Sequence, residues 1–221
     1  MSKIPNVIIA DTSDDTLKIA ASINGKSFFL DKKNNLRHIE NLIPEIDNVL
    51  KEIGEDKKSL EYAGICEGPG SFTGIRIGIA AFYGLAFGNN VKCFGFSAFE
   101  VYRYLLRDSE NIIIPLIDAK KNKFYCSFIS PKVLKPIEMF DLSSEEILQK
   151  TPSEAIFVGK DCRLLKGESD YNFSYKYEDG FSSRDAFNFS LDLILSGNEL
   201  RFPEPIYLRK SEAELSLLRG R

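Results

Sequence analysis

Residues 68–78 read Gly-Pro-Gly-Ser-Phe-Thr-Gly-Ile-Arg-Ile-Gly. Their glycines and proline end an apolar run, Leu60 to Glu67, and lead into a second run that is too long for a strand. The segment therefore predicts a strand, a tight turn and a buried helix over about 73–88. Such a turn presents backbone N–H groups at the positive end of a helix, which suits an anion.

The side chains of this turn add two features. Ser71 or Thr73 can cap the helix, and Arg76, one turn in, can hold a phosphate or a carboxylate. The stretch lacks the Lys-Ser/Thr ending of a P-loop and does not match Gly-x-Gly-x-x-Gly, so a tight turn that serves packing alone stays an alternative. The predicted glycine-rich loop comprises Gly68, Pro69, Gly70, Ser71, Phe72, Thr73, Gly74 and Arg76.

Small residues recur along the predicted helix. They follow the steps i, i+4, i+7, i+11 and i+14, which places them on one stripe: Gly74, Gly78, Ala81, Leu85 and Gly88. Glycine costs about 1 kcal/mol relative to alanine inside a helix, so close contact with a partner is expected to offset that cost. The partner is either a helix of this chain over about 35–53 or another protein. The residues on the adjoining faces, Ile75, Ile79, Phe82 and Tyr83, are then core or interface.

The chain before this loop predicts three strands and a helix. The strands cover residues 6–10, 17–23 and 27–30. Asn24-Gly25 is typical of a tight hairpin turn between the last two strands. Apolar residues at three- and four-residue steps predict an amphipathic helix over about 35–53, with a kink or a break at Pro44.

The middle of the chain repeats the opening. An apolar strand ends at Asp118 as the first strand ends at Asp11, and the strands of this second copy cover residues 112–117, 124–129 and 133–137. Such self-similarity predicts two copies of one supersecondary unit packed face to face. Paired carboxylates at equivalent strand ends can hold a metal-nucleotide. The candidate nucleotide site comprises Asp11, Thr12, Ser13 and Asp118.

The remaining segments complete a mixed α/β pattern. Strands are predicted over 91–96 and 155–158, helices over 98–106, 143–150 and 184–195, and mostly irregular chain over 161–177. We therefore expect an N-terminal lobe of residues 1–97. A shorter C-terminal lobe of residues 98–221 is expected to send one helix back across the first lobe.

Composition and charge exclude several classes of protein. The 221 residues include 29 Lys and Arg against 32 Asp and Glu, and the net charge of −3 excludes a strongly basic nucleic-acid coat. No apolar run approaches the roughly 20 residues of a membrane span, so we expect a cytoplasmic protein without membrane contact. His38 is the only histidine, and the four cysteines form no Cys-x-x-Cys pair. The sequence therefore predicts no metal site and no nucleophile–base pair of a protease.

Several segments together resemble one protein family. They are Ile8-Ile-Ala-Asp-Thr-Ser13, the glycine-rich stretch 68–78, Gly84-Leu-Ala86, Gly95-Phe-Ser97, Ile117-Asp-Ala119 with Tyr125, and Pro205-x-Tyr207-Leu-Arg209. In order and spacing they resemble the TsaB (YeaZ) family, and the resemblance covers most of the chain. The glycine-rich stretch is specific to TsaB and its paralogue TsaD, and the Ser-Phe-Thr at its centre favours TsaB.

The resemblance implies a fold and a function. The implied fold is the actin-like or Hsp70-like nucleotidyl fold of two duplicated ribonuclease-H-like lobes, the second reduced. TsaB proteins act in the N6-threonylcarbamoyladenosine modification of adenosine 37 in ANN-decoding tRNAs, as a catalytically inactive paralogue that binds TsaD. The resemblance also implies TsaE as a partner through the complex, a homodimer that exchanges for the heterodimer, and only indirect contact with tRNA.

The resemblance also assigns residues. Where TsaD-like proteins carry a His-x-x-x-His metal pair, this chain has Ser97-Ala-Phe-Glu-Val101, so no catalytic residue and no metal ligand is expected. The resemblance implies that the TsaD contact lies on the two helices of the N-terminal lobe. The expected interface residues are Leu36, Ile39, Ile43, Ile75, Gly78, Ile79, Phe82 and Tyr83.

Nucleotide binding separates the two functional hypotheses. Neither strand-end turn contains the glycines that let backbone amides wrap a phosphate, so no cofactor is expected to bind this chain tightly by itself. ATP or ADP would then bind, if at all, at the interface of the complex. The alternative is an autonomous ATP-binding phosphotransferase or ATPase of the same superfamily that uses Asp11, Thr12 and Asp118.

Overall fold

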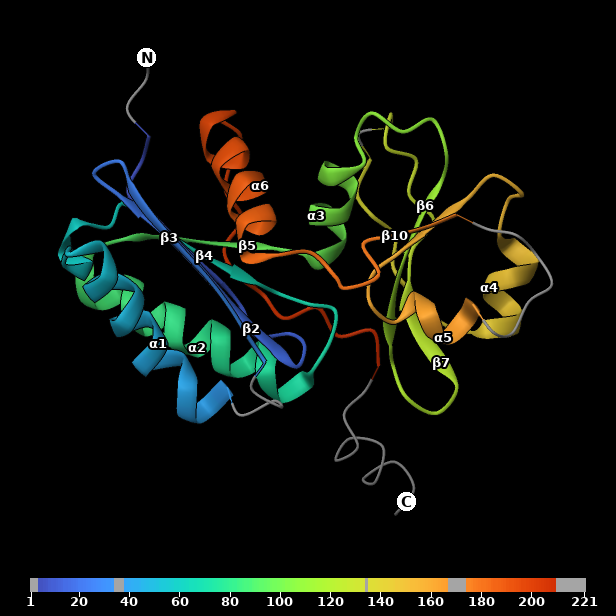
Figure 1. The fold of residues 1–221 in the computed structure, drawn as a ribbon, viewed down its shortest axis with the longest axis horizontal. Helices are drawn as coiled ribbons and strands as arrows, with labels where there is room; N and C mark the ends of the chain where they lie inside the picture. Colours follow the sequence, from blue (N-terminus) through green and yellow to red (C-terminus); the bar gives the residue numbers. More distant parts are fainter. Residues whose placement is uncertain (1–3, 34–37, 134, 167–173, 210–221) are drawn as a thin grey trace. The chain divides into compact units, whose positions relative to one another are not determined.

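The computed structural model describes residues 4–33, 38–133, 135–166 and 174–209 (Figure 1). These residues divide into two compact units. Unit 1 contains the described residues up to Val101 together with Phe181–Pro205, and unit 2 contains Tyr102–Gly180 and those from Ile206 onward. Unit 1 therefore includes residues 98–101 and 181–205 in addition to the predicted N-terminal lobe.

Unit 1 is built on a five-stranded sheet of order β3-β2-β1-β4-β5. Its strands are β1 (Val7–Asp11), β2 (Thr16–Ile23), β3 (Lys26–Lys33), β4 (Tyr62–Cys66) and β5 (Lys92–Phe96). β1, β2 and β3 pair antiparallel, whereas β1, β4 and β5 pair parallel. Asn24 and Gly25 adopt φ of 52° and 80°, the left-handed backbone that a tight turn between β2 and β3 requires.

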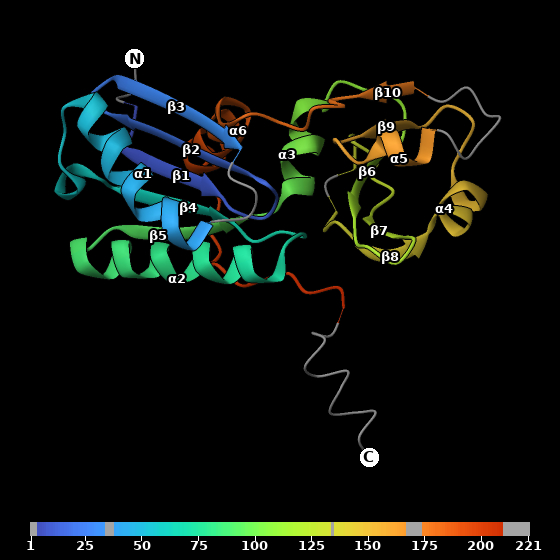
Figure 2. The same ribbon diagram turned by 60° about the horizontal axis from the view of Figure 1, so that its bottom comes forward.

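Helices cover both faces of this sheet. α1 (His38–Ile53) and α2 (Phe72–Asn89) lie side by side on one face, and α6 (Ser183–Leu195) lies on the other (Figures 1 and 2). A short 3-10 helix, η1 (Lys57–Ser59), follows α1. The main core lies between the sheet and the helix pair, and its fully buried members include Ile8, Leu17, Ile19, Ile65, Ile75 and Phe82.

α1 continues through Pro44 without interruption. Of the two predicted alternatives the break is therefore wrong, and a kink at this proline stays a prediction. Leu42, Ile46, Val49 and Leu50 are buried against the sheet on either side of the proline. Burial of this apolar face offsets the hydrogen bond that the proline nitrogen cannot donate.

Unit 2 is built on a second five-stranded sheet, of order β10-β9-β6-β7-β8. Its strands are β6 (Ile113–Asp118), β7 (Lys123–Cys126), β8 (Phe140–Ser143), β9 (Ile156–Val158) and β10 (Ser174–Lys176). The helices are α4 (Ser144–Lys150) and α5 (Cys162–Lys166), and α3 (Ala98–Leu105) begins in unit 1 and ends in unit 2. Ile114, Leu116, Phe157 and Cys162 are among the buried residues of this unit's core.

The two sheets have the same topology. β6 pairs antiparallel with β7 and parallel with β9, just as β1 pairs antiparallel with β2 and parallel with β4. β7 and β9 likewise add the outer strands β8 and β10 in the directions seen for β3 and β5. The predicted duplication is confirmed, and Asp11 and Asp118 are the last residues of the equivalent strands β1 and β6.

Two segments of unit 2 differ from the prediction. The third strand of the second repeat is β8 at Phe140–Ser143 and not the predicted 133–137. Pro136 carries no backbone N–H, so that segment is poorly suited to a sheet ladder. The stretch 161–177, predicted to be mostly irregular, contains α5 and β10.

Two glycines of α2 provide a matched test of its packing. In Gly78→Ala the added Cβ would overlap Thr12 Oγ1 and lie 2.9 Å from Ile65 Cδ1. We expect the free energy of unfolding to fall by about 1–3 kcal/mol, because the side chains of Thr12 and Ile65, or the helix itself, must shift to make room. In Gly84→Ala the Cβ enters open space, so the better helix propensity of alanine should raise stability by about 1 kcal/mol.

Urea denaturation of both variants measures these changes. Opposite signs for Gly78→Ala and Gly84→Ala support the close approach of α2 to the sheet at Gly78. A Gly78→Ala protein as stable as the wild type would contradict it.

Candidate functional site

Two turns of unit 1 meet at the carboxyl edge of its sheet. The turn Asp11–Ser13 follows β1, and the glycine-rich loop follows the neighbouring parallel strand β4, so both leave the sheet at the same edge. Ser71 N–H donates to the Ser13 carbonyl at 2.7 Å, and Thr12 Oγ1 donates to the Gly74 carbonyl at 2.8 Å. Gly70 packs so closely on Ser13 that a Cβ there would overlap the Ser13 carbonyl oxygen. The loop is therefore fastened to the β1 turn.

The glycine-rich loop caps α2 with Ser71. Its Oγ accepts from Gly74 N–H at 3.2 Å, so of the two predicted candidates Ser71, and not the exposed Thr73, supplies the cap. The N–H groups of Ser71 and Gly74 are thus bonded within the chain. Anion binding by this loop stays a prediction. An anion would have to use other donors, because these two N–H groups already donate within the chain.

The other members of the loop are placed around this cap. Gly68 and Pro69 are buried and joined by a cis peptide bond. The guanidinium of Arg76 lies 3.9 Å from the centroid of the Phe72 ring, one turn below it on α2. Arg76 thus rests on an aromatic face at the helix surface.

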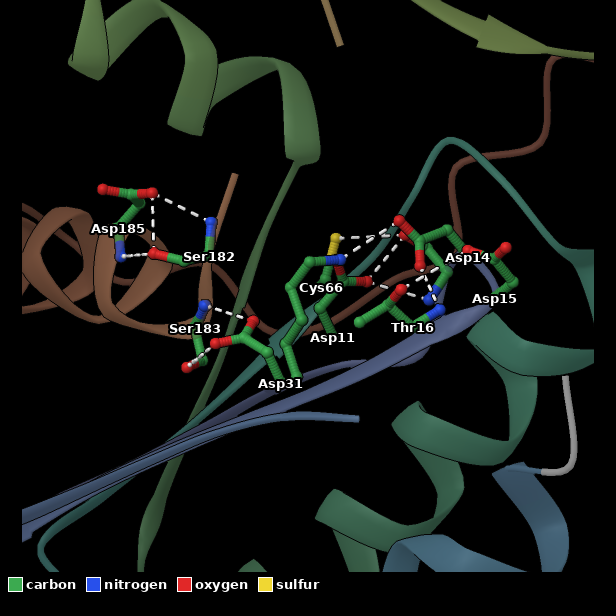
Figure 3. A network of polar contacts seen from close by, with 11 residues as sticks. Asp11, Asp14, Asp15, Thr16, Asp31, Cys66, Ser182, Ser183 and Asp185 are labelled. Atoms are coloured by element: carbon green, nitrogen blue, oxygen red, sulfur yellow. Dashed lines mark hydrogen bonds and ion pairs between the residues drawn. The ribbon is translucent and has the colours of Figure 1, made fainter. Parts of the chain in front are cut away.

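A buried ion cluster lies at the end of β1 (Figure 3). Lys18 Nζ donates to Asp11 Oδ2 at 3.0 Å and to Asp14 Oδ2 at 3.1 Å, with Lys18 and Asp11 only 4% and 1% exposed. Ser13 donates to the second Asp11 oxygen through its N–H at 2.8 Å and its hydroxyl at 2.6 Å. Cys66 Sγ donates to Ser13 Oγ at 3.8 Å. Both oxygens of the Asp11 carboxylate therefore accept hydrogen bonds from within unit 1.

The charge states of this cluster follow from its contacts. Burial by itself would raise the pKa of Asp11, but the Lys18 ammonium and the Ser13 hydrogen bonds outweigh burial and lower it. Burial opposes the charge of Lys18 as well, and the Asp11 and Asp14 carboxylates raise its pKa. Burial raises the pKa of the Cys66 thiol well above its ordinary value, so this thiol is no nucleophile at neutral pH.

Asp118 in unit 2 also has a lysine beside it. Its carboxylate accepts from Lys120 Nζ at 2.6 Å and from Lys120 N–H at 2.8 Å. Burial would raise the pKa of Asp118, and the hydrogen bonds from Lys120 lower it overall. Lys120 is 80% exposed, so this pair is far more open to solvent than Asp11 and Lys18. Asp11 and Asp118 belong to different units, and a nucleotide site that uses both stays a prediction.

Lys18 is the residue of this cluster that the sequence analysis did not identify. A signal was present, because Lys18 is a lone charge in the otherwise apolar run 17–23. In the β1–β2 hairpin it pairs directly opposite Asp11. Counting back from the Asn24-Gly25 turn does not reveal this, since the register between β1 and β2 depends on a different turn.

The predicted interface residues divide into buried and accessible ones. Ile75, Gly78, Ile79 and Phe82 are buried in the core of unit 1, which leaves a partner no surface to contact at those positions without rearrangement. Ile43 is 50% exposed, and Tyr83 is half-buried. Leu36 lies outside the described residues, and of Ile39 the structure describes only the backbone, in α1.

A groove of about 500 Å³ lies between α1 and α2 on the outer side of unit 1. It is lined by Ile43, Ile46, Asp47, Lys57, Ala80, Ala81, Gly84, Leu85, Gly88 and Asn89. A Cβ added at Gly84 or Gly88 would meet nothing within 4 Å, so the α2 backbone is open there. The small-residue stripe therefore has two roles: Gly78 packs inward on Thr12 and Ile65, whereas Gly88 lines the groove.

A C-terminal strap, residues 201–205, crosses unit 1 beside α2. Arg201 donates to Glu67 at 2.9 Å and to both oxygens of Glu100 at 2.8 and 2.6 Å, and Glu204 N–H donates to Glu67 at 2.8 Å. Burial raises the pKa of Glu67 despite the neighbouring guanidinium of Arg201. No local sequence pattern predicts these contacts, because their partners lie more than a hundred residues apart.

The strap reaches the surface of α2 through one tyrosine. The Tyr83 hydroxyl donates to the Pro203 carbonyl, and its ring stacks on Phe202 with centroids 4.7 Å apart. Phe202 is 64% exposed, and Phe87 on the same helix is 96% exposed. Apolar surface therefore extends from the groove region of α2 to its last turns.

The segment that replaces the histidine pair has structural roles. Ser97 Oγ accepts from the N–H groups of Phe99 and Glu100, each at 3.2 Å, so it caps the start of α3. Val101 is fully buried. Throughout the described residues, no group of three or more His, Cys, Asp or Glu side chains could hold a metal ion, and no helix is long and apolar enough to cross a bilayer.

Comparison with known families identifies the chain. A family model described as TsaD, tRNA N6-adenosine threonylcarbamoyltransferase, matches residues 32–147, more than half of the sequence. The chain belongs to this family. The match includes α1 and α2, which form the groove, and the glycine-rich loop that is fastened to the β1 turn.

Relatives of this chain within the family are described as tRNA threonylcarbamoyladenosine biosynthesis protein TsaB. The protein from Haemophilus influenzae is 24% identical and aligns over 91% of this chain and 82% of its own length. The protein from Bacillus subtilis is 25% identical and aligns over 72% of this chain and 73% of its own length. The predicted resemblance to TsaB (YeaZ) proteins is confirmed.

The fold has a counterpart among solved structures. The crystal structure of an uncharacterized protein with similarity to peptidase YEAZ from Pseudomonas aeruginosa superposes with a TM-score of 0.75 at 19% identity. The superposition covers 93% of this chain and all of the other. Together with the two duplicated sheets, this likeness confirms the predicted actin-like fold.

Replacement of Lys18 by methionine tests the ion cluster. Lys18→Met keeps the side-chain length but leaves a buried carboxylate unpaired, which should cost about 3–5 kcal/mol of stability at pH 7. In the wild type the pKa of Asp11 is lowered, so its stabilising effect is present at neutral pH and is lost as pH falls through that value. In Lys18→Met only the Ser13 hydrogen bonds still oppose burial, so this pKa should rise, and the variant should gain stability relative to the wild type as the pH falls from 7 to 5.

Urea denaturation across this pH range measures the effect. Lys26→Met is the matched control, because Lys26 is 62% exposed and pairs with Glu55 at 3.8 Å on the surface. The control should follow the wild type at every pH. A Lys18→Met protein whose stability runs parallel to the wild type from pH 7 to pH 5 would contradict the pairing of Asp11 with Lys18.

Proposed function

We propose that this chain acts in tRNA threonylcarbamoyladenosine biosynthesis as a non-catalytic subunit that binds a TsaD partner. Its membership in the family and its TsaB relatives support the pathway. The observation that carries the partner role is the open groove between α1 and α2. The proposal places the chain in the cytoplasm, with TsaE reached through the complex and tRNA contacted through TsaD.

The groove has the properties of a docking surface for a helix. Ala80, Gly84 and Gly88 are exposed, and the absence of large side chains lets a partner backbone approach α2 closely. Ile43, half exposed on α1, supplies an apolar anchor opposite them. An exposed apolar region of this kind usually marks an interaction site.

The non-catalytic part of the proposal rests on what the relevant residues do in the fold. Ser97 and Val101 stand where TsaD-like proteins are expected to carry metal-binding histidines, and neither side chain can replace an imidazole ligand. Ser97 is a helix cap and Val101 is buried. The Asp11 carboxylate is held by Lys18 and Ser13.

Light scattering of the full chain mixed with the cognate TsaD tests the docking surface. In Gly84→Glu a charge enters the groove where space is open, so the fold should persist. Burial of that unpaired charge at the interface should weaken the heterocomplex by about a hundredfold or more. Leu195→Glu on α6 is the matched control, because Leu195 is 52% exposed on the opposite face of the sheet. It should bind TsaD as the wild type does.

The results distinguish the outcomes. If Gly84→Glu binds TsaD as tightly as the wild type does, the groove is not part of the interface. A mass of twice the chain in the absence of TsaD, lost in Gly84→Glu, would show that a second copy also uses the groove. No complex between wild-type chain and TsaD contradicts the proposed function.

The alternative function is an autonomous ATP-binding phosphotransferase or ATPase. Calorimetric titration of the isolated chain with ATP and Mg²⁺ separates the two hypotheses. The proposed subunit should bind little nucleotide by itself. Sub-micromolar binding that is lost in Asp118→Asn would favour the enzyme.

A further inference from the structure

Lys18 is a buried cation coordinated by carboxylates. Its Nζ lies 3.0 Å from Asp11 Oδ2 and 3.1 Å from Asp14 Oδ2, with the side chain 4% exposed. The Phe181 ring lies over the ammonium, 4.8 Å from Nζ to the centroid. A buried charge is tolerated only where partners compensate for lost hydration, and here two carboxylates and an aromatic face do so.

The ammonium uses the oxygens that a divalent cation would need. Proteins usually bind Mg²⁺ through one or two carboxylates, and substrate phosphates and water complete its shell. At this turn Oδ2 of Asp11 and Oδ2 of Asp14 both accept from Lys18, and Asp14 Oδ1 accepts from Thr16 N–H at 2.6 Å. The remaining Asp11 oxygen accepts from Ser13. A second cation at this position would also meet the Lys18 charge at close range.

The sheet register holds the ammonium in place. Lys18 stands directly opposite Asp11 in the antiparallel β1–β2 pair, and the residues on both sides of it are buried. Asp118, at the equivalent end of β6, stands opposite Phe124 instead. Its lysine, Lys120, comes from the turn and is 80% exposed. A fixed, buried cation is therefore specific to the first repeat.

We propose that Lys18 is a built-in substitute for a divalent cation, which closes the Asp11–Asp14 turn to Mg²⁺. Lys18 is then the specificity-determining residue by which this unit keeps the nucleotide-binding fold without taking Mg²⁺ at β1. The inference deepens the proposed non-catalytic role and rests on it for its biological meaning. Its test uses metal alone and the isolated full chain, so it can fail while TsaD binding stands.

The test is a Mn²⁺ titration followed by the electron paramagnetic resonance signal of the free ion. Lys18→Ala removes the ammonium and opens space, whereas Lys18→Met removes the charge and keeps the space filled. We expect only weak Mn²⁺ binding without saturation in the wild type and in Lys18→Met. Lys18→Ala should have one saturable site, with an affinity for Mn²⁺ at least about tenfold above that weak binding. In the double variant Lys18→Ala/Asp11→Asn this site should be lost.

Two results would overturn the inference. One is a saturable Mn²⁺ site in the wild type that Asp11→Asn removes, and this arm needs no Lys18 variant to fold. The other is a folded Lys18→Ala chain that binds Mn²⁺ no better than Lys18→Met. If Lys18→Ala is unfolded without metal, its melting temperature is measured again in Mn²⁺. Refolding of Lys18→Ala in Mn²⁺ supports the inference. A Lys18→Ala chain that stays unfolded in Mn²⁺, while Lys18→Met is folded, contradicts it.

Discussion

The close approach of α2 to the turn after β1 is the constraint on which the rest of unit 1 depends. Gly70 lies against the Ser13 carbonyl and Gly78 against Thr12, with no room for a Cβ at either position. Two hydrogen bonds join the same segments, from Ser71 N–H to Ser13 and from Thr12 Oγ1 to Gly74. The height and direction of α2 above the sheet follow from these contacts. The groove that α2 forms with α1 follows in turn, because Ala81, Leu85 and Gly88 of the same helix line it.

This constraint explains how a glycine-rich loop can serve packing in a fold associated with nucleotide binding. A loop that binds phosphate leaves its N–H groups pointing at the ligand. Here the Ser71 N–H is bonded to the β1 turn and the Gly74 N–H to the cap of its own helix. The carboxylate at the end of β1 is bonded as well, to Lys18 and Ser13. The N–H groups and the carboxylate that nucleotide binding would require thus hold the turn, the loop and the helix together.

Most of the fold could be predicted from local patterns, and the orientation of α2 could not. The repeat ending at Asp11 and Asp118, the Asn24-Gly25 turn and the Ser71 cap all depend on neighbours in sequence, and all agree with the structure. α2 is apolar on nearly every side, so periodicity cannot tell which face meets the sheet. For that reason the pattern left Ile79 and Phe82 as core or interface; the family resemblance placed them at the interface, and the structure buries both in the core of unit 1. The Asp11–Lys18 ion pair depends on the register between β1 and β2, and the C-terminal strap depends on contacts between residues far apart in sequence; no local pattern encodes either.

α2 contacts the sheet and also lines the groove. Position 78 needs glycine because Thr12 and Ile65 leave no space, whereas Gly84 and Gly88 leave the backbone open. A larger residue at position 78 would push the helix away from the sheet and so displace the residues that line its groove with α1. The glycine-rich segment therefore fixes the geometry of the groove even where it binds no ligand. The proposed role as a subunit depends on that geometry, and a lysine paired with Asp11 is compatible with it.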